Sequence, residues 1–235
     1  VIRYRGTEAF NTWNEHIREA EINDWCKENL LPLLVKLPSE LMHAFGEDFA
    51  RSGDLTVIAP ITIEQNLKRT IPFIVELKNL PFKNQEQILF YMVDRLPRLI
   101  AGKLDARGNG EYLAEQAKFK YGSGRIEEVK QSQSWYLTNM PKLKAAFEDD
   151  MICIPRDADI LSDLRAIQVI NGIPKIPDTK TDDKKERHGD AAIAIAMAYL
   201  ASQMDVVEYA YESVKQSDYR DDDDINTGFK GRELL

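Results

Sequence analysis

The sequence predicts an α/β fold built on a mixed five-stranded sheet, with three antiparallel strands followed by two parallel strands and with helices on both faces. Two observations lead to this prediction. Three successive segments rich in β-branched and apolar residues are separated only by short turn signals, which is typical of an antiparallel meander. Beyond them, helical and extended patterns alternate, which is typical of parallel strands joined through helices. We also expect a helical N-terminal arm and a small β insertion.

The N-terminal arm is predicted from residues 7–34, in which apolar side chains recur at mostly helical spacing. Pro32 and Pro38 are expected to end this pattern, because proline lacks an N–H and clashes with the preceding helical turn. We assign residues 1–40 to the arm. The apolar positions are Phe10, Trp13, Ile17, Ile22, Trp25, Leu30 and Leu34.

The antiparallel part of the sheet is predicted from residues 41–49, 55–64 and 70–78. Turn signals at residues 51–54 and 65–66 separate these strands. A helix, a strand, a second helix, a strand and a third helix follow, with Ser134 as the expected N-cap of the third helix. This order of elements is that of the ribonuclease H-like fold. The five later elements are expected at residues 84–95, 99–104, 112–121, 125–130 and 135–148.

The C-terminal third contains short strand candidates at residues 152–155, 166–171 and 173–176, the last two forming a hairpin that turns at Asn171-Gly172. These strands form the predicted insertion. An alanine-rich helix is expected at residues 190–201, where small side chains let a helix approach a sheet closely. We place the globular domain at residues 41–204. Residues 205–235 are predicted to hold an amphipathic helix and an acidic tail.

Composition limits the function classes. The chain has 235 residues, 43% of them hydrophobic, which is enough for one full core and too little for a second full domain. Its formal net charge of −8 is unlike that of proteins that hold nucleic acid by charge alone, but lysines and arginines cluster locally, so DNA is not excluded. Two cysteines are too few for a zinc cluster or a disulfide framework and fit a reducing compartment.

The sequence contains no recognisable membrane-spanning segment or export signal. No apolar run approaches the ~20 residues that span a bilayer, and no signal peptide is visible. We therefore expect a soluble intracellular protein with no membrane partner. Because the chain begins at Val1 rather than at methionine, we also expect a fragment of a longer polypeptide.

Three aspartates form the predicted active site. Asp48 lies at the end of the first strand, Asp105 ends a later strand, and Asp190 opens the alanine-rich helix. Carboxylates at the ends of such elements can converge in space although they lie far apart in the chain. Oxygen ligands of this kind suit Mg²⁺ and Mn²⁺. Two such ions about 4 Å apart can support in-line attack of water on a phosphodiester.

The face on which Asp48 lies is left open by the sequence. Side chains alternate along a strand, so Phe45, Glu47 and Phe49 share one face, and Gly46 and Asp48 share the other. The two phenylalanines indicate the core side. Asp48 then faces the core only if helices cover both faces of the sheet.

Weaker site candidates lie nearby. Asp54 is an accessory candidate, although capping of the first hairpin explains it better. His188 can contact a phosphate or transfer a proton, and a structural hydrogen bond at a helix start explains it equally well. Candidates for contact with DNA are Arg107, Lys184, Lys185 and Arg187, for which a solvated surface is the competing explanation.

From about residue 46 to residue 201 the chain resembles the nuclease domain of phage terminase large subunits, most closely the DNA-packaging terminases of Mu-like phages and prophages. The stretches that carry the resemblance are Gly-Glu-Asp-Phe-Ala-Arg-Ser-Gly-Asp at 46–54, Ile-Leu-Phe-Tyr at 88–91, Asp-Arg-Leu-Pro at 94–97, Asp-Ala-Arg-Gly-Asn-Gly at 105–110 and Arg-His-Gly-Asp-Ala-Ala at 187–192.

The resemblance implies a ribonuclease H-like endonuclease that cuts double-stranded DNA during packaging with two divalent ions, Mg²⁺ or Mn²⁺. Asp48, Asp105 and Asp190 correspond to its metal ligands. The family also implies a portal protein and a small terminase subunit as partners, an upstream ATPase domain in the same polypeptide, and the cytoplasm of a bacterial host as the location. The arm at residues 1–40 would then be the link to that ATPase domain.

The chain departs from the family pattern at two points. Many terminases have His-Asp-Asp where this chain has His188-Gly189-Asp190, so an accessory acid is absent. No glycine-rich phosphate loop of the Gly-x-x-x-x-Gly-Lys-Ser/Thr type occurs, so no ATPase activity is expected from this chain.

Two alternatives to a packaging nuclease stay open. The chain can be another ribonuclease H-like nuclease, such as a junction resolvase or an enzyme that cleaves RNA–DNA hybrids. It can also be a non-catalytic module that docks a motor onto a portal, which would not require the three aspartates.

Overall fold

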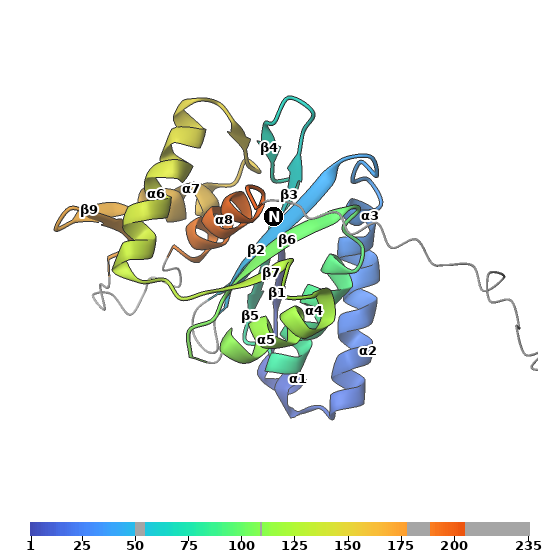
Figure 1. Ribbon diagram of the computed structural model, residues 1–235. Coiled ribbons are helices and arrows are strands. Elements are labelled where there is room, and N and C mark those ends of the chain that lie inside the picture. Colours follow the sequence, from blue (N-terminus) through green and yellow to red (C-terminus); the bar gives the residue numbers. More distant parts are fainter. Residues whose placement is uncertain (50–54, 109, 178–188, 205–235) are drawn as a thin grey trace, which may run out of the picture.

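The computed structural model describes residues 1–49, 55–108, 110–177 and 189–204 (Figure 1). Its elements confirm the alternation of strands and helices predicted for the middle of the chain. The elements in chain order are β1 (Ile2–Arg5), α1 (Glu8–Thr12), α2 (Glu15–Trp25), the π-helical turn η1 (Cys26–Leu30), α3 (Leu31–Leu34), β2 (Met42–Asp48), β3 (Thr56–Ile63), β4 (Arg69–Thr70), β5 (Val75–Lys78), α4 (Phe82–Val93), β6 (Leu99–Asp105), α5 (Gly110–Tyr121), β7 (Ile126–Val129), α6 (Gln133–Glu148), β8 (Ile152–Cys153), α7 (Ala158–Arg165), β9 (Gln168–Ile170), β10 (Ile173–Lys175) and α8 (Asp190–Ala201).

The central sheet confirms the predicted mixed arrangement. Its main path runs β1-β5-β3-β2-β6-β7. Strand β3 is antiparallel to both β2 and β5, whereas β2, β6 and β7 are mutually parallel. The five predicted strands correspond to β2, β3, β5, β6 and β7, in the order expected of a ribonuclease H-like sheet. The predicted number of strands is corrected, because β1, β4 and β8 bring the sheet to eight strands in the described chain.

Helices cover both faces of the sheet (Figure 1). On one face, the helices between residues 8 and 34 pack with α4 and α5 around a cluster that includes Phe45 and Leu104. On the other face, α6, α7 and α8 pack around a cluster that includes Ala44 and Ala101. Neighbouring residues of β2 and of β6 thus belong to opposite cores, as alternation along a strand requires. This double coverage places Asp48 in a buried setting on the α8 face.

The first 40 residues pack as part of the same unit. Strand β1 pairs in parallel with β5 at the sheet edge, which the sequence did not predict. Ile22 and Leu30 are buried in the same cluster as Ile88 of α4. Residues on both sides of residue 40 thus share one hydrophobic cluster, and the assignment of residues 1–40 to an arm that leads to another domain stays a prediction.

Two helix boundaries differ from the predictions. Helix α6 begins after Ser132 rather than Ser134, because the Ser132 hydroxyl accepts the N–H of Trp135 at 3.1 Å. Pro32 lies in the first turn of α3 rather than after the end of a helix. Proline is tolerated there because a first-turn N–H has no intrahelical acceptor.

The predicted insertion contains a helix as well as strands. The hairpin β9–β10 turns at Asn171 and Gly172 as predicted, and both residues have positive φ. Helix α7, which the sequence did not predict, precedes the hairpin and packs on α8. Within the described ranges, no helix combines the length and apolarity needed to cross a membrane.

Candidate active site

Two of the predicted aspartates end neighbouring parallel strands. Asp48 is the last residue of β2 and Asp105 is the last residue of β6. The strands are in register, with Glu47 opposite Leu104, so the two aspartates lie at the same edge of the sheet. Both belong to the face that α8 covers, and both are buried. Adjacent carboxyl ends of parallel strands are where ligand sites form in open α/β sheets.

The third aspartate is placed by close packing of α8 on β2. Asp190 is the first residue of α8 and is also buried. Gly46, two residues before Asp48, allows this packing: a Cβ at Gly46 would lie 2.2 Å from the Ala198 nitrogen and 2.3 Å from the Ala194 oxygen. The helix backbone therefore rests directly on β2. The predicted close approach of the alanine-rich helix is confirmed.

The three carboxyl groups affect one another electrostatically. Burial raises the pKa of Asp48 well above its ordinary value, and the nearby charges of Asp190 and Asp105 raise it further. Arg107 and a hydrogen bond from Gln131 act in the opposite direction. Asp48 therefore lies in a concentration of negative charge. A cation bound there would stabilise the ionised form of Asp48.

Glu47 adds a fourth carboxyl group, on the opposite face of β2. Its side chain is fully buried, and neither carboxyl oxygen has a hydrogen-bond partner in the described part of the protein. Burial, followed by the charges of Asp105 and Asp48, raises the pKa of Glu47 well above its ordinary value. Uncharged Glu47 costs less to bury than the anion, which is consistent with its apolar surroundings.

Arg107 pairs with Asp105. Its Nε donates to Asp105 Oδ1 at 3.0 Å and its Nη2 donates to Oδ2 at 3.3 Å. The Arg107 backbone N–H also donates to Oδ1, at 3.1 Å. The guanidinium thus supplies positive charge to the carboxylate cluster. The side chain is half exposed, so it has room to move into solvent.

Gln131 and Tyr136 hold the Asp48 carboxyl. Gln131 Nε2 donates to Asp48 Oδ1 at 3.3 Å, and the Tyr136 hydroxyl donates to Gln131 Oε1 at 3.0 Å. The second bond fixes the amide orientation, because it occupies the oxygen and turns the NH₂ group toward Asp48. Sequence reasoning missed both roles. A polar residue shortly after a strand end is the only signal for Gln131, and it is not specific.

The oxygen-rich residues suit hard divalent cations such as Mg²⁺ and Mn²⁺. The mutual repulsion of carboxylates at Asp48 is what a cation bound there would relieve. Across the described ranges, however, no group of three or more His, Cys, Asp or Glu side chains is arranged so that it could hold a metal ion. A cation that binds Asp105 would compete with the Arg107 guanidinium for the carboxylate oxygens.

The remaining predicted site residues cannot be placed against this cluster. Asp54, Lys184, Lys185, Arg187 and His188 lie outside the described residues. Arg107 is described, and it contacts Asp105 as reported above. Its predicted contact with DNA stays a prediction.

In sequence, the chain is similar to two phage and prophage proteins. It is 41% identical over 228 residues to the Mu-like prophage FluMu protein gp28 of Haemophilus influenzae, an alignment that covers 96% of this chain and 45% of that protein. It is 43% identical over 207 residues to the probable terminase, large subunit gp28, of Escherichia phage Mu, covering 87% of this chain and 38% of that protein. The chain spans less than half the length of these curated relatives. No family model matches the chain.

In structure, the chain has the fold of large terminase nucleases. The magnesium-bound nuclease from thermophilic phage G20c superposes with a TM-score of 0.56 at 19% identity, over 68% of this chain and 82% of that one. The zinc-bound form gives 0.54 at 20% identity, over 72% and 84% of the two chains. The nuclease domain of Thermus phage P74-26 gives 0.53 at 16% identity, over 69% and 80%. At these identities the likeness concerns the fold alone. Together with the sequence relatives, it confirms the resemblance inferred from the motifs.

Proposed function

We propose that this chain, a relative of the gp28 proteins of Mu-like phages with the fold of large terminase nucleases, is a metal-dependent endonuclease acting on double-stranded viral DNA during packaging. One observation supports this most strongly: Asp48, Asp105 and Asp190 are terminal residues of β2, β6 and α8, and the charges of Asp190 and Asp105 act on the buried Asp48 carboxyl group.

The three aspartates are the proposed metal ligands. The structural relatives include nucleases with bound magnesium, zinc and cobalt. When bound, two divalent ions supply Lewis acidity toward the phosphodiester and lower the pKa of the attacking water. Gln131 would orient the Asp48 carboxyl toward the ions. The ion pair between Arg107 and Asp105 would break, so that the Asp105 carboxylate could bind the ions. We propose Mg²⁺ or Mn²⁺, since all three ligands are hard oxygen donors.

DNA would be contacted by basic residues around this cluster. Arg107, once it leaves Asp105, carries a half-exposed guanidinium that can bind phosphate. Lys184, Lys185 and Arg187 are further proposed contacts, and His188 and Asp54 are proposed accessory groups. The remaining proposals follow from the family resemblance of the motifs: an ATPase domain in the same polypeptide, a portal protein and a small terminase subunit as partners, and a location in the bacterial cytoplasm. The missing phosphate loop leads us to propose no ATPase activity in this chain.

The proposal is tested by cleavage of supercoiled plasmid with Mn²⁺, Mg²⁺ or EDTA. We expect nicked and linear products only with a divalent ion. Asp48→Asn should reduce the rate by at least about 100-fold, because loss of a ligand should cost no less than loss of a group that supports one. Asp149→Asn, the same change at an exposed helix C-cap, should cleave at the unsubstituted rate.

The outcome also distinguishes the alternatives. Preference for an RNA–DNA hybrid or a four-way junction over plasmid would favour another ribonuclease H-like nuclease. Equal rates for Asp48→Asn and the unsubstituted chain would contradict the proposed site. A docking module is favoured if the chain does not cut and binding to a portal protein is unaffected by the Asp48, Asp105 and Asp190 substitutions.

A further inference from the structure

The start of α8, which carries Asp190, lacks a capping side chain of its own. Gly189 is its N-cap residue and has φ of +82°, a left-handed conformation that other residues adopt at a cost. A Cβ at Gly189 would also lie 2.5 Å from Ile176 Cδ1. A side chain at this position, which is aspartate in many terminases, would require a strained backbone and would displace Ile176. The first-turn N–H groups of α8 need an acceptor from elsewhere.

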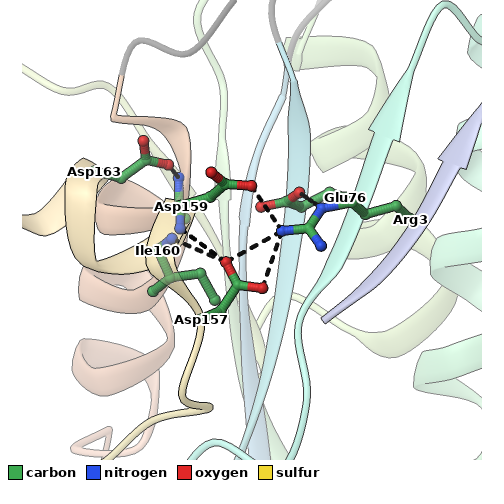
Figure 2. Close-up of polar contacts among 7 residues, drawn as sticks. Arg3, Glu76, Asp157, Asp159, Ile160 and Asp163 are labelled. Atoms are coloured by element: carbon green, nitrogen blue, oxygen red, sulfur yellow. Dashed lines mark hydrogen bonds and ion pairs between the residues drawn. The ribbon is translucent and has the colours of Figure 1, made fainter.

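Asp163 of α7 supplies this acceptor (Figure 2). The Ala191 N–H donates to Asp163 Oδ2 at 3.2 Å, across a separation of 28 residues. Asp163 is only 3% exposed, so the bond is shielded from water. Its negative charge also lies at the positive end of the helix macrodipole, which stabilises both the carboxylate and the helix start. Ala191 directly follows Asp190, so this bond acts on the turn that presents the proposed metal ligand.

Helix α7 is itself held in place at its other end. Asp157 caps α7 by accepting the N–H groups of Asp159 and Ile160 at 2.9 and 3.3 Å. Arg3 of β1 donates from Nη2 to both Asp157 oxygens at 3.1 Å and to Asp159 at 3.0 Å. Arg3 Nε also bonds Glu76 of β5 at 2.7 Å. Figure 2 shows the Arg3 guanidinium between these groups, joining α7 to the sheet edge.

We propose that Asp163 is a positioning residue that sets the direction of the first turn of α8, so that Asp190 reaches the metal ions shared with Asp48 and Asp105. This inference rests on the proposed function. Asp163 touches neither ion nor DNA in this scheme; it acts through Ala191. The Arg3 contacts to Asp157 and Asp159 keep α7 at the distance that the bond to α8 requires.

The test is calorimetric titration of the full chain with Mn²⁺ in the absence of DNA, at a temperature where circular dichroism shows each variant to be folded. Asp163→Ala should weaken Mn²⁺ binding about tenfold, the usual effect of removing a group that orients a ligand. Asp163→Asn keeps a carbonyl acceptor for Ala191 and should bind Mn²⁺ within about threefold of the unsubstituted chain. Asp24→Asn, at an exposed position on α2, controls for charge loss.

Amide hydrogen exchange gives a readout that needs no metal. In Asp163→Ala, exchange in a peptide covering residues 189–193 should accelerate at least about tenfold, because Ala191 loses its acceptor, while exchange in residues 197–201 stays unchanged. Asp163→Asn should restore most of the protection. Unchanged exchange at residues 189–193 in Asp163→Ala would overturn the inference.

Asp190→Asn separates this inference from the proposed function. If Asp190→Asn abolishes Mn²⁺ binding and folded Asp163→Ala binds Mn²⁺ normally, the positioning role is wrong and the metal site stands. If Asp190→Asn leaves Mn²⁺ binding unchanged, the proposed metal site is wrong and the positioning role is overturned with it.

Discussion

At the scale of single residues, Glu47 and Asp48 are two consecutive buried carboxyl groups whose side chains enter opposite cores. Burial and neighbouring carboxylates raise the pKa of both groups in the folded protein. The folded state therefore binds more protons than the unfolded state between the ordinary carboxyl pKa and the raised pKa. In the absence of metal, the contribution of these two groups to stability is fully present below the ordinary carboxyl pKa and is lost as pH rises through this window.

Substitution of Glu47 by glutamine should remove part of this pH dependence. Glu47→Gln keeps the shape of the side chain but cannot ionise, so we expect a higher Tm for the metal-free protein at pH 8. Each kcal/mol by which loss of the ionisable group stabilises the folded protein corresponds to an increase in Tm of about 2–4 °C. The gain should shrink as pH falls toward the ordinary glutamate pKa of 4.5.

The measurement is thermal unfolding from pH 5 to pH 8 in EDTA. Glu115→Gln, an exposed glutamate on α5, serves as the control and should change Tm little at any pH. A Tm difference between Glu47→Gln and the unsubstituted chain that grows toward pH 5 would contradict the argument.

At the scale of elements, contact of α8 with β2 depends on the absence of a side chain at Gly46. Gly46→Ala would place a methyl group against helix backbone, which cannot rotate away. We expect a loss of about 1–3 kcal/mol or more, because overpacking of a close-packed core costs this much. The matched change Gly124→Ala has open space around its Cβ and should be close to neutral.

Urea denaturation of the two glycine variants checks this expectation. Gly46→Ala should also lower Mn²⁺ affinity, since a displaced α8 moves Asp190 away from Asp48. Equal midpoints for the two variants would show that α8 tolerates displacement from β2.

The sequence predicted elements that have strong apolar patterns and missed those that depend on distant partners. Strands β2 and β3 and helix α8 are almost entirely buried, so their composition indicated them. Strand β1 has four residues of mixed polarity and is stabilised by pairing with β5. Helix α7 follows strand-like residues, and only its N-cap Asp157 marked its start.

The site follows the same pattern. Asp48, Asp105 and Asp190 could be predicted because each lies at the end of a recognisable element. Gln131 and Asp163 could not, because they act through hydrogen bonds to residues 83 and 28 positions away. From the sequence alone, Gly189 indicated only that the accessory acid of the family motif is absent. In the structure, Gly189 has a positive φ, and a Cβ at this position would contact the Ile176 side chain.

At the scale of the whole molecule, the N-terminal helices and the sheet share one hydrophobic cluster, so we expect them to unfold as one cooperative unit. Ile22 of α2 is fully buried in the cluster that contains Leu89 and Phe45. Ile22→Ala should therefore destabilise the whole protein by about 2–5 kcal/mol. Ile17→Ala on the same helix removes a side chain that is 51% exposed and should cost about 0.5 kcal/mol or less.

Tryptophan fluorescence can distinguish cooperative from separate unfolding. Trp25 reports on the N-terminal helices, and Trp135 reports on the opposite face of the sheet. In single-tryptophan variants, Ile22→Ala should shift both unfolding midpoints equally. A shift seen only by Trp25 would mean that residues 1–40 unfold as an independent domain.

The position of Arg3 has a practical consequence for protein engineering. Arg3 lies on the edge strand β1 and binds Asp157 of the helix that contacts α8, so the chain immediately before Ile2 adjoins a structural support of the proposed active site. A purification tag or fusion partner joined rigidly at this point would strain the pairing of β1 with β5 and, through Arg3 and α7, would alter the position of Asp190. A flexible glycine-serine spacer should insulate the proposed active site from whatever is attached.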